Sequence, residues 1–251
     1  MSNESGKTTI VVGASRGLGR GIAAALAEAG ERVVAVARSE AALTELSASS
    51  KLVQIEVADA REAAVASTLL ERHDPESVVV VAGAAPSPQP LQLHSWETFS
   101  VNWETDVRIA FHWLREALLK PLRPGSRVVV VSSGAALRGS PLSGGYAGAK
   151  ATQRFIAAYA QEEANRSGLE IAFSTLFPQI TPATDLGRPA VEAYAARGGV
   201  TVDEYVRRLG EPLTPSIAGA AVLELLRSDV GALSPEYLLT GAGLQPLPAT
   251  R

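Results

Sequence analysis

The residues best suited to chemistry in this chain are Tyr146 and Lys150, spaced as Y-x-x-x-K, with Ser133 thirteen residues before the tyrosine. On a helix, Tyr146 and Lys150 are i and i+4 neighbours and share one face. A free phenol has a pKa of about 10 and is a poor acid–base catalyst at neutral pH, whereas a nearby ammonium stabilises its anion. Lys150 would supply that charge, and Ser133 would bond the substrate oxygen. The set predicts proton transfer between Tyr146 and a carbonyl or alcohol oxygen.

A glycine-rich segment, GASRGLG at residues 13–19, lies directly between a predicted strand and a predicted helix. Glycines in this position let the backbone turn tightly and approach a pyrophosphate at the helix N-terminus. A plain strand-to-helix turn is the alternative, but strand, loop and helix come in the order that dinucleotide binding requires. Together with Tyr146 and Lys150, the segment predicts hydride transfer between a nicotinamide cofactor and a carbonyl or alcohol.

The choice between the two nicotinamide dinucleotides depends on the end of the second predicted strand, which reads Val36-Ala37-Arg38. A site that prefers NAD holds the ribose hydroxyls with an Asp or Glu here, and neither is present. Arg38 and Arg16 instead offer guanidinium groups for charge-assisted bonds to a 2′-phosphate. Either arginine could be an ordinary surface residue, but the missing acid and the two matching positions favour NADP(H).

Short β-branched segments that alternate with Ala- and Leu-rich segments must position these residues. The predicted strands are Thr8–Val12, Arg32–Ala37, Lys51–Val57, Ser77–Ala82, Arg127–Ser132, Leu169–Phe177 and Tyr237–Thr240. The predicted helices include Leu18–Ala29, Glu40–Ala48, Ala60–Arg72, Trp96–Leu119 and Tyr146–Arg166. Nearly unbroken Val and Ile in the first, fourth and fifth strands are typical of parallel strands buried on both faces.

This alternation predicts an α/β fold: a doubly wound, mostly seven-stranded parallel sheet in three αβα layers, which is a Rossmann fold. Ligands bind such sheets at the carboxyl ends of the strands, where the glycine-rich segment and Ser133 both fall. We expect a single domain over residues 1–251, with a flexible N-terminus at residues 1–7.

Composition excludes several other classes of protein. The chain is 46% hydrophobic and 20% charged, with no apolar run near the length of a membrane span and no secretory signal. We therefore expect a cytoplasmic protein without a membrane partner. The absence of cysteine rules out disulfides and thiolate catalysis, and the three histidines have no ligand-like spacing, so no metal site is expected. A net charge of −3 gives no basic field for nucleic acid.

These features resemble the short-chain dehydrogenase/reductase family in its single-domain form of about 250 residues. Besides the motifs above, the resemblance rests on Ala82-Gly83 after the fourth strand, Asn102 in SVNW, Pro178 after the sixth strand, and Leu239-Thr240-Gly241. It implies a catalytic set of Asn102, Ser133, Tyr146 and Lys150. Lys150 would also bind the nicotinamide ribose, and Asn102 would hold a proton-relaying water; a helix-interior amide with no role is the alternative for Asn102.

With the residues already named, the expected cofactor site comprises Gly13, Ser15, Arg16, Gly17, Leu18, Gly19, Arg38, Val57, Ala82, Gly83, Tyr146, Lys150, Pro178 and Thr181.

The chain departs from the family pattern in two neighbouring strands. The family usually has Thr before the first glycine and Asn-Asn-Ala-Gly after the fourth strand, whereas this chain has Val12-Gly13 and Val80-Val81-Ala82-Gly83. In a sheet ordered 3-2-1-4, the ends of strands one and four are adjacent. We infer that a buried polar bridge has been replaced as a unit by an apolar contact, a change that can be nearly neutral. Introducing Asn at Val81 alone should then be destabilising.

Two further departures lie in the second half. The family's Pro-Gly after the sixth strand is Pro178-Gln179 here, and the spacing onward to Thr184 fits the usual motif imperfectly. The family's C-terminal Val-Asp-Gly-Gly is also absent, and related proteins use that end at a subunit interface. We expect a homo-oligomer, a dimer or a tetramer, whose assembly differs from the common tetramer.

Residues 185–213 fall where the family places its substrate lid. Apolar and charged residues are mixed there, which predicts an apolar pocket with some polar contacts, and Gly198-Gly199 is a candidate hinge. For Tyr194, packing against the sheet is favoured over lining the pocket. The expected substrate is a small-molecule carbonyl or alcohol.

Two alternatives to an NADPH-dependent carbonyl reductase or alcohol dehydrogenase are open. One is a catalytically weak dinucleotide-binding sensor or scaffold, supported by the altered Val80-Val81 and Gln179 but not by the intact Asn-Ser-Tyr-Lys set. The other is epimerase or dehydratase chemistry on a nucleotide sugar, which uses the same Tyr and Lys but normally needs a longer C-terminal substrate domain.

Overall fold

The computed structural model describes residues 7–248, so the expected flexible N-terminus lies outside the described residues except for Lys7. Over this range the chain forms one eight-stranded sheet in the order β3-β2-β1-β4-β5-β6-β7-β8. The strands are β1 (Thr8–Val12), β2 (Arg32–Ala37), β3 (Val53–Val57), β4 (Ser77–Val80), β5 (Ser126–Val131), β6 (Ile171–Pro178), β7 (Glu236–Thr240) and β8 (Gly243–Pro246). The first seven pair in parallel, and β8 pairs with β7 in the antiparallel direction.

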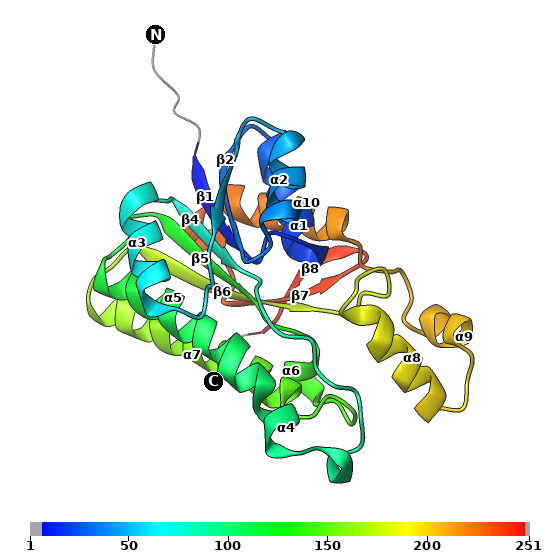
Figure 1. Ribbon diagram of the computed structural model, residues 1–251. Helices are drawn as coiled ribbons and strands as arrows, with labels where there is room; N and C mark the ends of the chain where they lie inside the picture. The colour runs from blue at the N-terminus through cyan, green and yellow to red at the C-terminus, as the bar shows by residue number, and fades with distance from the viewer. Residues whose placement is uncertain (1–6, 249–251) are drawn as a thin grey trace.

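Helices cover both faces of the sheet and make three layers (Figure 1). The α-helices are α1 (Gly17–Glu28), α2 (Glu40–Ala48), α3 (Ala63–His73), α4 (Trp96–Asn102), α5 (Arg108–Leu119), α6 (Ala135–Arg138), α7 (Tyr146–Arg166), α8 (Gly187–Arg197), α9 (Val202–Arg208) and α10 (Pro215–Arg227). Shorter segments are the 3₁₀ turns η1 (Leu91–Leu93) and η3 (Val230–Ala232) and the π-helical turn η2 (Trp103–Val107).

Two apolar cores lie on opposite faces of the sheet. Ile22 of α1, Leu43 of α2 and Val222 of α10 belong to the core on one face. Leu69 of α3 and Trp113 of α5 belong to the core on the other. Because each buried strand contributes alternate side chains to the two cores, the Val-rich strands must be apolar throughout. The doubly wound, three-layer α/β fold is thus confirmed.

The ends of β1 and β4 lie side by side, as expected from the predicted strand order. Val12 and Val80 are register partners, and both are fully buried. The backbone N–H groups of Val81 and Ala82 both donate to the Val12 carbonyl, at 2.9 and 2.8 Å. The apolar pair therefore occupies the crevice where the strand order reverses, next to the first glycine of the loop.

Three features differ from the expectations. The sheet has an eighth strand, β8, which follows β7 through a tight turn and covers its outer edge. The expected helix over Trp96–Leu119 is divided into α4 and α5 by the π turn η2, which accommodates one more residue per turn than an α-helix. The short helix α6, which is not among the expected helices, lies between Ser133 and Tyr146.

Candidate active site

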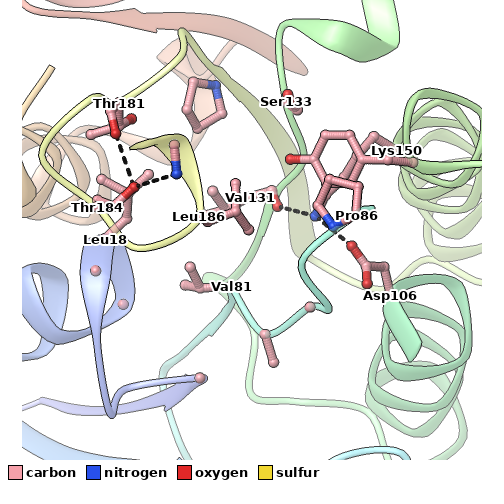
Figure 2. Close-up of a pocket in the computed structure, with 18 of the residues that line it drawn as sticks. Leu18, Val81, Pro86, Asp106, Val131, Ser133, Lys150, Thr181, Thr184 and Leu186 are labelled. Carbon is pink, nitrogen blue, oxygen red and sulfur yellow. Dashed lines mark hydrogen bonds and ion pairs between the residues drawn. The ribbon is translucent and has the colours of Figure 1, made fainter. Parts of the chain in front are cut away.

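A cavity of about 950 Å³ opens at the carboxyl ends of the strands and contains most of the predicted site (Figure 2). Thirteen of the fourteen predicted cofactor residues line it: Gly13, Ser15, Arg16, Gly17, Leu18, Gly19, Arg38, Ala82, Gly83, Tyr146, Lys150, Pro178 and Thr181. Val57 does not line the cavity and is 51% exposed, whereas the next four residues, 58–61, do line it. Of the predicted catalytic set, Ser133, Tyr146 and Lys150 line the cavity and Asn102 does not.

The glycine-rich loop brings bare backbone to the wall of the cavity. Gly13 has φ +97°, and a Cβ there would lie 2.7 Å from the Ala82 nitrogen. A Cβ at Gly19 would lie 2.1 Å from the Gly13 carbonyl oxygen. Any larger residue at these two positions would push β1, α1 and the end of β4 apart. The loop leads into the N-terminus of α1, where free N–H groups and the helix dipole favour an anion.

Four charged residues gather at the end of the cavity beside β2 and β3. Arg16 and Arg38 line it together with Asp59 and Arg61. Arg61 Nη2 lies 2.6 Å from Asp59 Oδ2. This hydrogen bond, with a smaller contribution from the charge of Arg38, lowers the pKa of Asp59 to about 2. Asp59 is thus held as an anion between two arginines, a feature that the sequence reasoning did not single out.

Ser133 and Tyr146 stand on either side of the α6 segment. Ser133 follows β5, and its hydroxyl accepts a hydrogen bond from the Ala135 N–H at 3.2 Å, which starts α6. Tyr146 is the first residue of α7, and Gly145 before it packs so tightly that a Cβ would lie 2.1 Å from the Phe99 carbonyl oxygen. The neighbouring Ser132 hydroxyl donates to the Lys150 carbonyl at 2.9 Å and ties β5 to α7.

Lys150 lies one turn along α7 and is buried. Its Nζ is 5.6 Å from the centre of the Tyr146 ring. It donates to Gln153 Oε1 at 3.0 Å. It also donates to the Val131 carbonyl at 3.4 Å and forms an ion pair with Asp106 Oδ2 at 3.2 Å (Figure 2). Burial is the largest single influence and lowers the pKa of Lys150, but the charges of Asp106 and Tyr146 and the hydrogen bond to Asp106 together outweigh it, and the net result is a raised pKa.

The predicted Asn102 is buried at the end of α4, with its side chain turned toward the chain segment after β4. Its Nδ2 donates to the Ala84 carbonyl at 2.7 Å and to Asp106 Oδ1 at 3.3 Å. Asp106 lines the cavity and was missed by the sequence reasoning. The available signal was its position four residues after Asn102 in a segment expected to be helical, which places the two side chains about one helical turn apart.

The segment after β6 closes another side of the cavity. The buried Thr184 hydroxyl donates to the Thr181 carbonyl at 2.9 Å and accepts from the Gly187 N–H at 3.0 Å, which fixes the turn into α8 (Figure 2). Gln179, in place of the family's glycine, lines the cavity, and its Nε2 donates to the Glu211 carbonyl at 2.6 Å. Its side chain therefore bridges this segment to the chain before α10.

The lid segment forms α8 and α9, and one expectation for it was wrong. Tyr194 does not pack against the sheet; it lines the cavity and stacks on Tyr205 of α9, with ring centres 6.2 Å apart. Burial raises the pKa of Tyr194, against the opposing effect of a hydrogen bond with the Leu142 backbone. This aromatic pair joins α8 to α9 at the wall of the cavity.

Comparison with known proteins identifies the family. The model of the short chain dehydrogenase family matches residues 7–195, which is well over half of the chain. The chain belongs to the short-chain dehydrogenase family. It is therefore an oxidoreductase of that family, and the resemblance read from its motifs is confirmed. A search of the curated proteins gives no match.

Several solved structures of this family have the same fold. A 3-oxoacyl (acyl-carrier-protein) reductase from Agrobacterium tumefaciens with NADP bound is 28% identical, with a TM-score of 0.74 over 94% of this chain and 93% of that one. An actinorhodin polyketide ketoreductase with NADPH is 21% identical, with a TM-score of 0.79 over 96% and 98%. An alcohol dehydrogenase from Thermococcus sibiricus with 5-hydroxy-NADP is 24% identical, with a TM-score of 0.75 over 96% and 99%.

Two findings concern other kinds of site. Among the described residues, no cluster of three or more His, Cys, Asp or Glu side chains is placed to hold a metal ion. Over residues 7–248, no helix is both long enough and apolar enough to span a membrane.

Proposed function

We propose that this protein is an NADPH-dependent carbonyl reductase of the short-chain dehydrogenase family, acting on a small or medium ketone, aldehyde or 3-oxoacyl group. The observation that carries the proposal is the placement of Ser133, Tyr146 and Lys150 in the wall of the same cavity as the glycine-rich loop. That cavity is large enough for a dinucleotide and a substrate together. Structural relatives described as ketoreductases and acyl-carrier-protein reductases support the substrate class.

The residues around the cavity fit a nicotinamide dinucleotide. Gly13 and Gly19 leave backbone where a side chain would collide, and α1 presents its N-terminus to the same space. Such a loop accepts a pyrophosphate. Arg16 and Arg38 would hold a 2′-phosphate, and the arginine-flanked Asp59 would face the adenosine end. Several relatives carry NADPH or NADP, which agrees with this preference, although one reductase from Brucella melitensis carries NADH.

In the proposed mechanism the bound nicotinamide supplies the hydride. Ser133 would bond the carbonyl oxygen of the substrate and orient it toward Tyr146. Tyr146 would give its phenolic proton to that oxygen, and Lys150 would stabilise the phenolate that remains. Tyr194 and the lid helices would cover the substrate and exclude water from the reacting atoms.

The test is NADPH oxidation against a panel of ketones, aldehydes and 3-oxoacyl thioesters, with Tyr146→Phe compared to wild type. Loss of the proton donor should lower kcat by about 10²- to 10⁴-fold. Tyr159→Phe is the matched control, because Tyr159 lies on the same helix but is 53% exposed, and it should keep full turnover. Full turnover of Tyr146→Phe on a substrate that wild type reduces would show that the proton-transfer role is wrong. Tight NADPH binding with no turnover on any carbonyl would favour the sensor or scaffold alternative.

We also infer a cytoplasmic homo-oligomer. Phe111 of α5 and Phe155 of α7 are 48% and 65% exposed, and these two helices pack against each other on one face of the sheet. Exposed aromatic residues grouped on packed helices are typical of protein–protein contact surfaces. Light scattering coupled to size exclusion should give the mass of a dimer or a tetramer.

A further inference from the structure

Asp106 is a carboxylate with no exposure to solvent, set in the π turn between α4 and α5. Its Oδ1 accepts hydrogen bonds from the Ala84 N–H at 2.8 Å and from Asn102 Nδ2 at 3.3 Å. Its Oδ2 has no hydrogen-bond partner among the described residues and contacts Lys150 Nζ as an ion pair at 3.2 Å. Burying a carboxylate lowers the stability of a fold unless the charge is paired. The ion pair with Lys150 therefore offsets the free-energy cost of burying Asp106.

The reverse dependence holds for Lys150. Lys150 donates hydrogen bonds to the Gln153 amide oxygen and the Val131 carbonyl, and its third contact is the ion pair with the Asp106 carboxylate. Asp106 is the charged one of the three. Gln153 is tied to the same place, since its Nε2 donates to the Asp106 carbonyl at 2.9 Å. The direction in which the ammonium points is therefore set from η2 as well as from α7.

The surrounding backbone is shaped around the carboxylate. A Cβ at Gly83 would lie 2.7 Å from Asp106 Oδ2, so the residue after Ala82 leaves the space that Asp106 fills. Through Ala84 and Gly83, Asp106 also contacts the segment of the cofactor wall that follows β4. One side chain thus connects the segment after β4, the π turn and the catalytic helix α7.

We propose that Asp106 is a positioning residue that holds the Lys150 ammonium beside Tyr146 and sets the pH at which the Tyr146–Lys150 pair releases its proton. Besides Lys150 and Tyr146, which interact within the pair, two titratable groups interact with it: Asp106 from η2 and Tyr194 from α8. Of these two, Asp106 is the one that forms the ion pair with Lys150. The activity readout of the proposal depends on the proposed reductase function.

The sign of the effect follows from charge alone. Removing a negative charge makes it easier for either member of the pair to lose a proton, so the first proton leaves at lower pH whichever group gives it up. At an effective dielectric of about 20, a unit charge on the order of 10 Å from an ionising group shifts its midpoint by about one pH unit, and a closer charge shifts it more. The shift is therefore largest where Lys150, which is 3.2 Å from Asp106 Oδ2, gives up the proton. Carbonyl reduction requires the protonated pair, so the fall in kcat/KM at high pH should occur at a lower pH.

The experiment measures kcat/KM for carbonyl reduction from pH 6 to 10 in wild type and Asp106→Asn. The midpoint of the high-pH fall should drop by about one unit or more in Asp106→Asn. Glu116→Gln is the matched control: it removes another buried carboxylate, paired with Arg115 on α5 away from the cavity wall, and it should leave the midpoint unchanged. An unchanged midpoint in Asp106→Asn would overturn the proposal.

A second measurement does not depend on turnover, so it tests the proposal even if Asp106→Asn is too unstable for kinetic assays. A stability cycle compares Asp106→Asn, Lys150→Met and the double variant by urea unfolding without cofactor. Because each single variant leaves a buried charge or donor unpaired, the double variant should be clearly more stable than the sum of the two losses predicts. Additive losses would overturn the pairing itself. If no carbonyl is reduced but the cycle shows coupling, the proposed function fails while the Asp106–Lys150 link stands.

Discussion

Replacing Val80 with Asn tests whether the crevice between β1 and β4 depends on its apolar contact. Val80 is fully buried, with Val12 on one side in register and Val130 on the other. The loss of valine burial costs about 2 kcal/mol, and an amide left without partners costs about 1–3 kcal/mol more. The expected loss in the free energy of unfolding is about 4 kcal/mol, which corresponds to a fall in Tm of roughly 8–16 °C for a chain of this size.

The assay is thermal unfolding followed by circular dichroism, with urea unfolding to check that the m-value is unchanged. Val57→Asn is the matched control, because it makes the same substitution on a strand at a residue that is 51% exposed, and it should cost less than about 1 kcal/mol. The double variant Val12→Thr/Val80→Asn gives the amide a partner and should recover part of the loss. A Tm for Val80→Asn within about 2 °C of wild type, or a double variant less stable than the single one, would refute the reasoning. Val81→Asn should have a smaller effect, since Val81 is only partly buried at the cavity wall.

Two further predictions concern the charged end of the cavity. Arg38→Ala should raise the KM for NADPH roughly 10- to 100-fold through the loss of a charge-assisted contact and leave the KM for NADH nearly unchanged; an equal change for both cofactors would contradict the 2′-phosphate role. The folded-state pKa of Asp59 is lowered to about 2 from 3.8, so the stability that it contributes is present above pH 3.8 and is lost as the pH falls through 2. Asp59→Asn should therefore be less stable than wild type at pH 7, and urea midpoints should converge as the pH falls from 4 to 2; a constant gap would count against this assignment.

Much of the fold follows from local patterns in the sequence. β1 and β2 begin and end where their Val-rich segments predict, and α7 runs from Tyr146 to Arg166 as expected. These segments are bounded by residues that stop an element physically, such as Gly30, which has φ +89° after α1. β8 was not predicted because its four residues, GLQP, include a proline and show no alternation. Its formation depends on the edge of β7, which is a tertiary feature.

In the candidate site, too, the residues placed by local patterns could be predicted, and those placed by tertiary contacts could not. Residues that act through backbone geometry or lie at strand ends, such as Gly13 and Ser133, could be located from order and spacing alone. The role of Asp106 could not be predicted in this way, because it depends on how far the helix is rotated by the π turn. The spacing of apolar residues in the sequence does not indicate that turn. The position of Tyr194 likewise depends on Tyr205, a partner in another helix that no local pattern connects to it.

The π turn η2 makes the length of the Trp96–Leu119 segment part of the site. An α-helix rotates by about 100° per residue, so deleting one residue from Trp103–Val107 would restore a regular helix while rotating its two halves relative to each other. Either Asp106 would leave Lys150 or Trp113 would leave the core that it now fills. A single-residue deletion here would thus keep the helical content but break either the Asp106–Lys150 contact or the packing of Trp113. The spacing between Asn102 and Trp113 therefore constrains this protein as strongly as the identity of either residue.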